Sequence, residues 1–94
     1  MTRSFSILWQ PVPGRDQMAR LSFNAVEDKG FFVVDRPDLD IYARARTVWD
    51  LKRDIVDELD CLYWQVLTRH RSRLSDSDIL IRDRLQDLIG LSVN

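Results

Sequence analysis

The sequence is poor in the residues that most catalytic and metal sites need. It has one cysteine, Cys61, and one histidine, His70, among 94 residues. One cysteine excludes an internal disulfide, and together with one histidine it falls short of the four ligands of a structural zinc site. The three glycines stand far apart, so there is no glycine-rich loop to hold a phosphate group. We therefore expect no enzyme activity, no catalytic residues, no metal and no cofactor.

The few reactive side chains that are present lie in settings that favour structural roles. His70 stands among three arginines at an expected helix end, where a solvated imidazole is the simpler interpretation. Cys61 falls in the middle of an expected helix, with no histidine beside it in sequence to act as a base. The spacing of Asp35, Asp38 and Asp40 suggests oxygen ligands for a hard cation, but the glycine and closing glutamate of a calcium loop are missing. We interpret this segment as a polar loop.

Long hydrophobic runs are also missing. The segment up to Gln10 is short, mixed in polarity and followed by Pro11, so it fits neither a signal peptide nor a membrane span. With 45% hydrophobic residues, the chain can still bury a core, and we expect one soluble domain over residues 1–94 in a reducing bacterial cytoplasm. The net charge of −1 gives no general attraction to nucleic acid or to an anionic membrane.

The first half of the sequence has the two-residue period of β-strands. Apolar and polar residues alternate in three segments, and a short apolar run at 31–34 gives a further strand, so we expect a sheet within residues 4–46. The segment 11–16 has turn chemistry, and Gly30 ends a tight hairpin in which it is free to take a positive φ. The expected inward residues are Phe5, Ile7, Trp9, Ala19, Leu21, Phe23, Ala25, Ile41, Ala43 and Ala45.

The period changes to that of a helix at Thr47. Thr47 and Asp50 form a variant capping box, and apolar residues at helical spacing predict a helix over 48–69. A second capping pattern at 75–78 opens a helix over 76–90, which Gly90 ends. This order predicts an α+β fold, with an antiparallel sheet of three to four strands and two helices packed on one face. The expected helix stripes are Val48, Leu51, Ile55, Leu59, Leu62 and Val66, then Ile81, Leu85 and Leu88.

Three short motifs within residues 19–64 can be compared with a known family. They are a glycine-led strand at 30–34, Pro-Asp-Leu at 37–39 and a threonine-led helix start at 47–51. In this order they resemble the β-β-β-α core of HicB-like antitoxins. The resemblance covers about half of the chain, and it implies that the protein binds a toxin.

The chain also departs from that family. The family follows Pro-Asp-Leu with a turn similar to Pro-Gly-Cys, where this chain has Asp40-Ile41-Tyr42. Members also carry a DNA-binding segment after the core, whereas residues 70–94 offer one helix and no such motif. The resemblance therefore implies toxin binding without transcriptional control. Small immunity proteins, which neutralise secreted toxins and have similar size and α+β content, are the neighbouring interpretation.

The outer side of the first helix is the preferred candidate for a binding surface. At 100° per residue, Trp64 lies nearly opposite the apolar stripe, beside Arg53, Asp57 and Asp60. Exposed tryptophans are typical of binding hot spots, and carboxylates beside one suit a basic partner. We expect a toxin-like protein or a second copy, in a homodimer, as the partner. The alternative is that Trp64 packs under the N-terminal strand or the 70–75 linker. A flank of this helix, expected to lie under the C-terminal helix, consists of Trp49, Val56, Tyr63 and Leu67.

A second candidate surface is a basic strand face. Arg44 and Arg46 share one side of their strand with Tyr42, and Arg20 lies on the second strand. Basic residues with an aromatic residue on a sheet can bind single-stranded nucleic acid. The alternative is an outward polar face with Arg–Asp pairs across strands, which the overall acidity favours. We therefore keep a small nucleic-acid-binding module as the second hypothesis for the function.

Overall fold

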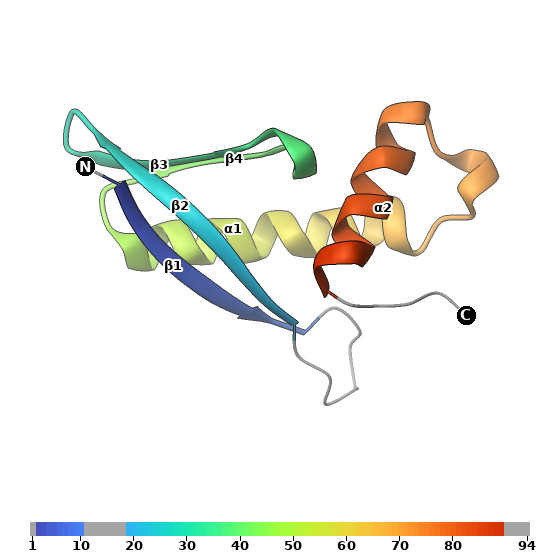
Figure 1. The fold of residues 1–94 in the computed structure, drawn as a ribbon, viewed down its shortest axis with the longest axis horizontal. Helices are drawn as coiled ribbons and strands as arrows, with labels where there is room; N and C mark the ends of the chain where they lie inside the picture. The colour runs from blue at the N-terminus through green and yellow to red at the C-terminus, as the bar shows by residue number, and fades with distance from the viewer. Residues whose placement is uncertain (1, 11–18, 90–94) are drawn as a thin grey trace.

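A computed structural model describes residues 2–10 and 19–89, and these residues form a sheet with helices beside it (Figure 1). The turn expected at 11–16 and the helix stop expected at Gly90 lie outside the described residues. The predicted α+β fold is confirmed. Its elements are β1 (Thr2–Trp9), β2 (Ala19–Asp28), β3 (Phe31–Arg36), β4 (Ile41–Ala45), α1 (Val48–Leu62) and α2 (Asp76–Ile89).

The sheet has four antiparallel strands in the order β1-β2-β3-β4. β1 and β2 pair along the whole of β1, from Thr2 opposite Val26 to Trp9 opposite Ala19. β2 and β3 pair over only three residues of each strand, next to the hairpin, so the far end of β2 diverges from β3. The hairpin turns through Lys29 and Gly30, both at positive φ (52° and 82°), which is the backbone of a type I′ turn.

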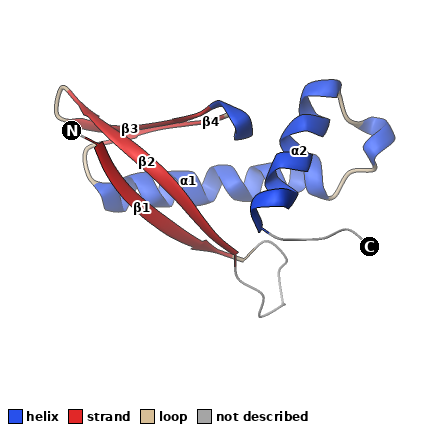
Figure 2. Cartoon of the chain, in the orientation of Figure 1, coloured by secondary structure: helices blue, strands red, loops and turns tan. Residues whose placement is uncertain are grey.

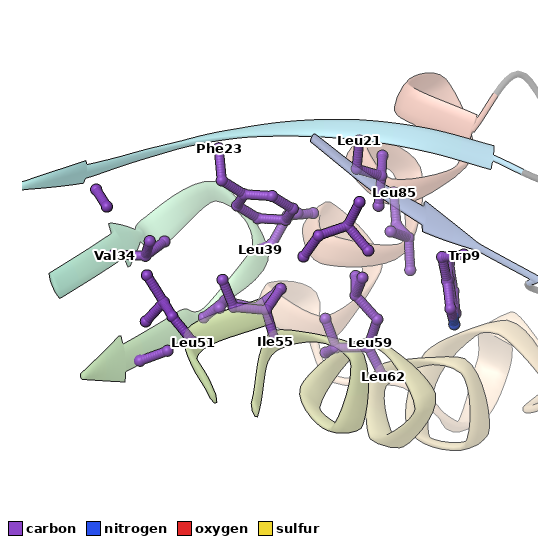
Figure 3. Packing of buried hydrophobic residues seen from close by; sticks show 14 of the residues in the cluster. Trp9, Leu21, Phe23, Val34, Leu39, Leu51, Ile55, Leu59, Leu62 and Leu85 are labelled. Carbon is purple, nitrogen blue, oxygen red and sulfur yellow. The ribbon is translucent and has the colours of Figure 1, made fainter. Parts of the chain in front are cut away.

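The core lies between the sheet and α1 (Figure 3). The alternation expected in β2 is confirmed, because its four inward residues are buried while the residues between them are exposed. The stripe expected on the first helix is confirmed from Leu51 to Val66, with Leu51, Ile55 and Leu59 fully buried, whereas Val48 at its start is only partly buried. Burial of a large aliphatic side chain is worth about 1.5–3 kcal/mol, which makes this stripe the main attachment of α1 to the sheet.

The start of α1 agrees with the sequence prediction, and its end does not. The backbone N–H of Asp50 donates to the Thr47 side-chain oxygen at 3.1 Å, as a helix cap should. The regular α-helix ends at Leu62 rather than Arg69 and continues as a π-helical turn, η2 (Tyr63–Leu67). There the N–H of Thr68 donates to the carbonyl of Tyr63 at 3.1 Å, five residues back, and the helix then stops.

α2 stands at the far end of α1 and contacts η2, β2 and the single turn η1 (Pro37–Leu39) (Figure 2). It begins at the expected capping pattern, where the N–H of Asp78 donates to the Ser75 hydroxyl at 3.2 Å. Leu85 of α2 is fully buried in the same core as the sheet residues, and Ile81 and Leu88 are partly buried against it. The second helix therefore covers the C-terminal end of α1 and leaves its N-terminal end uncovered.

Candidate protein interface

The side of α1 that faces away from the sheet carries two exposed tryptophans. Trp64 is 64% exposed and Trp49 is 78% exposed, the largest exposed fractions among the aromatic residues in the described chain. Trp64 therefore points away from the buried stripe, as the helical geometry predicted. The alternative expectation, that the N-terminal strand or the 70–75 linker packs over it, does not hold. We call the exposed side of this helix the outer face of α1, and its residues are Trp49, Arg53, Val56, Asp57, Asp60 and Trp64.

Trp64 is held by the π-helical turn at the end of α1. The ring of the half-buried Tyr63 lies 5.5 Å from the Trp64 ring in an edge-on arrangement, and Thr68 donates a hydrogen bond of 2.8 Å from its hydroxyl to the Trp64 carbonyl. Edge-on aromatic pairs gain about 0.5–1.5 kcal/mol beyond the area they bury. The Tyr63 ring contacts the indole and the Thr68 bond holds the Trp64 backbone, while most of the indole surface stays in solvent.

Trp49 was not singled out by the sequence analysis, which placed it on a flank covered by the C-terminal helix. That expectation is wrong for Trp49, because α2 packs at the opposite end of α1. Trp49 instead lines a small, open, mostly apolar pocket of about 190 Å³ together with Lys52, Arg53 and Val56. A turn of 100° per residue could have shown that Trp49 and Trp64 lie only about 60° apart around the helix.

The charged residues of the outer face differ in the ion pairs and hydrogen bonds that they make within the chain. Arg53 is 3.5 Å from the carboxylate of Asp50, and both side chains are largely exposed, so this ion pair contributes little. Asp57 is exposed and makes no ion pair within the described residues. Asp60, which the sequence analysis offered to a partner, accepts a 2.8 Å hydrogen bond from the indole nitrogen of Trp9. One of its oxygens therefore serves the fold, and its contact with a partner stays a prediction.

The basic strand face exists in part. Tyr42 and Arg44 are on the side of β4 that faces away from α1, Arg46 follows just after the strand, and Tyr42 is 60% exposed. The Arg44 guanidinium lies 4.0 Å from the centre of the Phe31 ring and that of Arg46 lies 5.1 Å from it, so both cations stack on one aromatic residue. The second candidate surface is therefore a compact Arg–Phe–Arg cluster at the edge of the sheet.

Arg20 does not join this cluster, contrary to the grouping made from the sequence. Arg44 is opposite Val33, and Val33 is opposite Val26 of β2. Arg20 lies six residues from Val26 along β2, which is about 20 Å in an extended strand. It faces Leu8 at the far end of the β1–β2 pair.

The other singled-out residues are dispersed. His70 is exposed and its Nδ1 accepts from the Ser72 backbone N–H at 3.2 Å, so it caps the start of the single turn at Arg71–Arg73. Cys61 is exposed on α1.

Asp38 binds Arg36 and Arg84 through its carboxylate oxygens, at 3.1 Å and 2.9 Å. Within residues 2–10 and 19–89, no group of three acidic, histidine or cysteine side chains is placed to hold a metal ion.

The comparisons with known proteins add no assignment: no family model, no curated protein and no solved structure matches this chain. Among the described helices, none has the length and apolar character that crossing a membrane requires. The function of the chain therefore has to be inferred from the surfaces of the molecule itself.

Proposed function

We propose that this chain is a non-catalytic protein-binding domain of the antitoxin or immunity type, which acts in the bacterial cytoplasm through the outer face of α1. The observation that carries the proposal is the exposure of Trp49 and Trp64 on one side of one helix. An indole in water forgoes roughly 1.5–3 kcal/mol of burial energy, and two of them on one face make that face costly to leave uncovered. Large aromatic anchors of this kind are typical of protein interfaces.

The carboxylates on this face favour a protein partner over nucleic acid. Asp57 and Asp60 lie about two turns and one turn before Trp64 on the same side of the helix, where they would repel a phosphate backbone and would speed the approach of a basic protein. The element order from β2 to α1 is the β-β-β-α order that the resemblance to HicB-like antitoxins implies. A toxin-like protein and a second copy of the chain are the two partners that fit this surface.

The test compares two variants with changes on opposite sides of the molecule. The double variant Trp49→Ala/Trp64→Ala removes both exposed indoles of the outer face, and Tyr42→Ala removes an aromatic residue of similar exposure from the open face of the sheet. Tagged wild-type protein and both variants are used to isolate partners from the native host. Each partner is then purified and its Kd measured by calorimetry, beside the Kd for self-association.

At least one of these Kd values should rise tenfold or more, about 1.4 kcal/mol, in the tryptophan variant and stay unchanged in Tyr42→Ala. Circular dichroism should show both variants folded, because none of the three side chains lies in the core. If the tryptophan variant keeps every protein interaction of the wild type at full strength, the proposed function is wrong.

A second candidate function, binding of single-stranded nucleic acid, is favoured by the stacking of Arg44 and Arg46 on Phe31 beside Tyr42. Cations and aromatic rings on an open sheet face can stack bases and neutralise phosphates. Fluorescence anisotropy with labelled oligonucleotides tests it. Sub-micromolar binding at near-physiological salt that weakens steeply as salt rises, and that Arg44→Ala abolishes, would favour this function over the first.

A further inference from the structure

The residues of the outer face of α1 are placed symmetrically about one point on the helix. Trp49 and Trp64 are equally far in sequence from the midpoint between Val56 and Asp57. Fifteen residues of helix separate the two indoles by about 22 Å along the axis. If a second copy of α1 lies antiparallel on the first, with its midpoint on the same point, Trp49 of each copy faces Trp64 of the other.

The charged residues of this face also lie on either side of this midpoint, and the charges on its two sides have opposite signs. Arg53 lies on the N-terminal side of the midpoint, and Asp57 and Asp60 lie on the C-terminal side. An antiparallel copy places residue 53 of each helix opposite residue 60 of the other, with Asp57 one turn away, so each arginine meets the Asp60 carboxylate of the other helix and the same complementary contact forms twice. The present partner of Arg53 is Asp50, at 3.5 Å on the surface, and this weak pair is easily exchanged. One oxygen of Asp60 accepts from Trp9, and a carboxylate has a second oxygen to offer.

The apolar area is also of the right order for a dimer. Each tryptophan carries about 150–250 Å² of surface, and Trp49 and Trp64 are 78% and 64% exposed. Four such indoles, two from each copy, would remove roughly 400–700 Å² from water, a large part of the ~1,200 Å² at which stable interfaces begin. Val56 and the pocket beside Trp49 lie at the centre and at the edge of the same strip.

We propose that the outer face of α1 binds the same face of a second copy of this chain, with the two α1 helices antiparallel across a two-fold axis between Val56 and Asp57. This inference rests on the proposed function, because it names the protein that this face binds. The dimer has four layers, a sheet, two helices and a sheet. It leaves the open face of each sheet turned outward.

Charge reversal gives a test that a loss of folding cannot imitate. Arg53→Asp makes the outer face wholly acidic, and Asp57→Arg adds a second cation one helical turn from Arg53, while Asp60 stays. Both side chains are exposed, so each variant should fold like the wild type. In the antiparallel dimer residue 53 of one copy faces residue 60 of the other and lies within about 5 Å of residue 57 along the axis. Arg53→Asp therefore repels itself, Asp57→Arg loses part of its attraction, and the mixture again brings residues 53 and 57 of opposite charge together. Analytical ultracentrifugation of wild type, each variant alone and the equimolar mixture measures all four association states.

The wild type should be a dimer, each variant alone should associate at least tenfold more weakly, and the mixture should form a one-to-one dimer that is tighter than either variant alone. Arg44→Asp, a matched reversal on the open sheet face, should leave the dimer unchanged. A monomeric wild type overturns this inference, and so does a dimer that both α1 reversals leave intact.

The wild type could prove to be a monomer while the Trp49→Ala/Trp64→Ala variant no longer binds a host protein that the wild type binds. This result would refute only the choice of a second copy as the partner. In that case the proposed function would stand and its partner would be another protein. If neither self-association nor any host interaction depends on the two tryptophans, both proposals fail together.

Discussion

The indole nitrogen of Trp9 donates a 2.8 Å hydrogen bond to a carboxylate oxygen of Asp60, 51 residues further along the chain. Trp9 is 3% exposed at the end of β1, and Asp60 lies on the exposed side of α1. The bond ties the edge strand of the sheet to the helix and satisfies the one polar atom of a buried tryptophan. The same carboxylate therefore holds the fold together and borders the outer face of α1.

This bond leads to a first prediction about stability. Asp60→Ala should lower the free energy of unfolding by about 1–3 kcal/mol, because it leaves the indole N–H without an acceptor. Asp60→Asn keeps an oxygen in place and should cost less. Asp57→Ala, on the same face and without an ion pair among the described residues, is the control and should stay within about 0.5 kcal/mol. Urea denaturation measures all three, and equal losses for Asp60→Ala and Asp57→Ala would show that the bond contributes nothing.

The local periodicities of the sequence predicted the fold well, because burial on one side of an element repeats at short range. The inward positions of β2 and the stripe of α1 are buried as expected, and the Thr47 cap forms. The end of α1 was not predictable in this way. The π-helical turn depends on a bond between Thr68 and Tyr63 that no helical spacing encodes.

The candidate site was predicted in part. The expectations that proved wrong depend on contacts between segments that are distant in the sequence. The exposure of Trp64 follows from its angle on the helix, which is local information. Trp49 was assigned to a covered flank because the docking position of α2 depends on Leu85 and on the Arg84–Asp38 ion pair, which join distant segments. The separation of Arg20 from Arg44 depends on the short register between β2 and β3. Alternation alone cannot give a register.

The second prediction concerns the buried stripe of α1. Leu59 is fully buried between the helix and the sheet, so Leu59→Ala should lower the free energy of unfolding by about 2–5 kcal/mol through lost burial and the cavity left behind. Glu58→Ala, one residue earlier and exposed, should change it by less than about 0.5 kcal/mol. Thermal melts followed by circular dichroism measure both, and an unchanged melting temperature for Leu59→Ala would contradict the assignment of the stripe.

The third prediction concerns the hairpin between β2 and β3. Nothing lies within 4 Å of a Cβ placed on Gly30, so the cost of Gly30→Ala comes only from its φ of +82° and should be about 1–2 kcal/mol. Lys29 has a φ of 52° without being glycine or asparagine, so Lys29→Asn should raise the stability by a fraction of that amount. Chemical denaturation of both variants decides the matter. A stabilising Gly30→Ala would mean that the turn does not have this backbone.

The last prediction concerns pH and the docking of α2. Partial burial raises the pKa of Asp38, but hydrogen bonds from Arg84 and Arg36, with their positive charges, outweigh it and hold the pKa below its ordinary value of 3.8. A carboxyl group whose pKa is lowered by folding stabilises the protein above the pKa of the unfolded chain, and that contribution is lost as pH falls through the folded pKa. The Asp38 side chain is 35% exposed, so solvent screening keeps the contribution below about 1 kcal/mol.

Wild type should therefore be slightly more stable than Asp38→Asn at neutral pH, and the difference should shrink as the pH falls below about 4. Asp40→Asn is the matched control, because Asp40 lies two residues away at a φ of 54°, a conformation that asparagine tolerates. Urea denaturation at a series of pH values between neutral and acid gives the three curves. A difference between wild type and Asp38→Asn that stays constant over this range would show that the Arg84–Asp38–Arg36 contact does not stabilise the docked helix through charge.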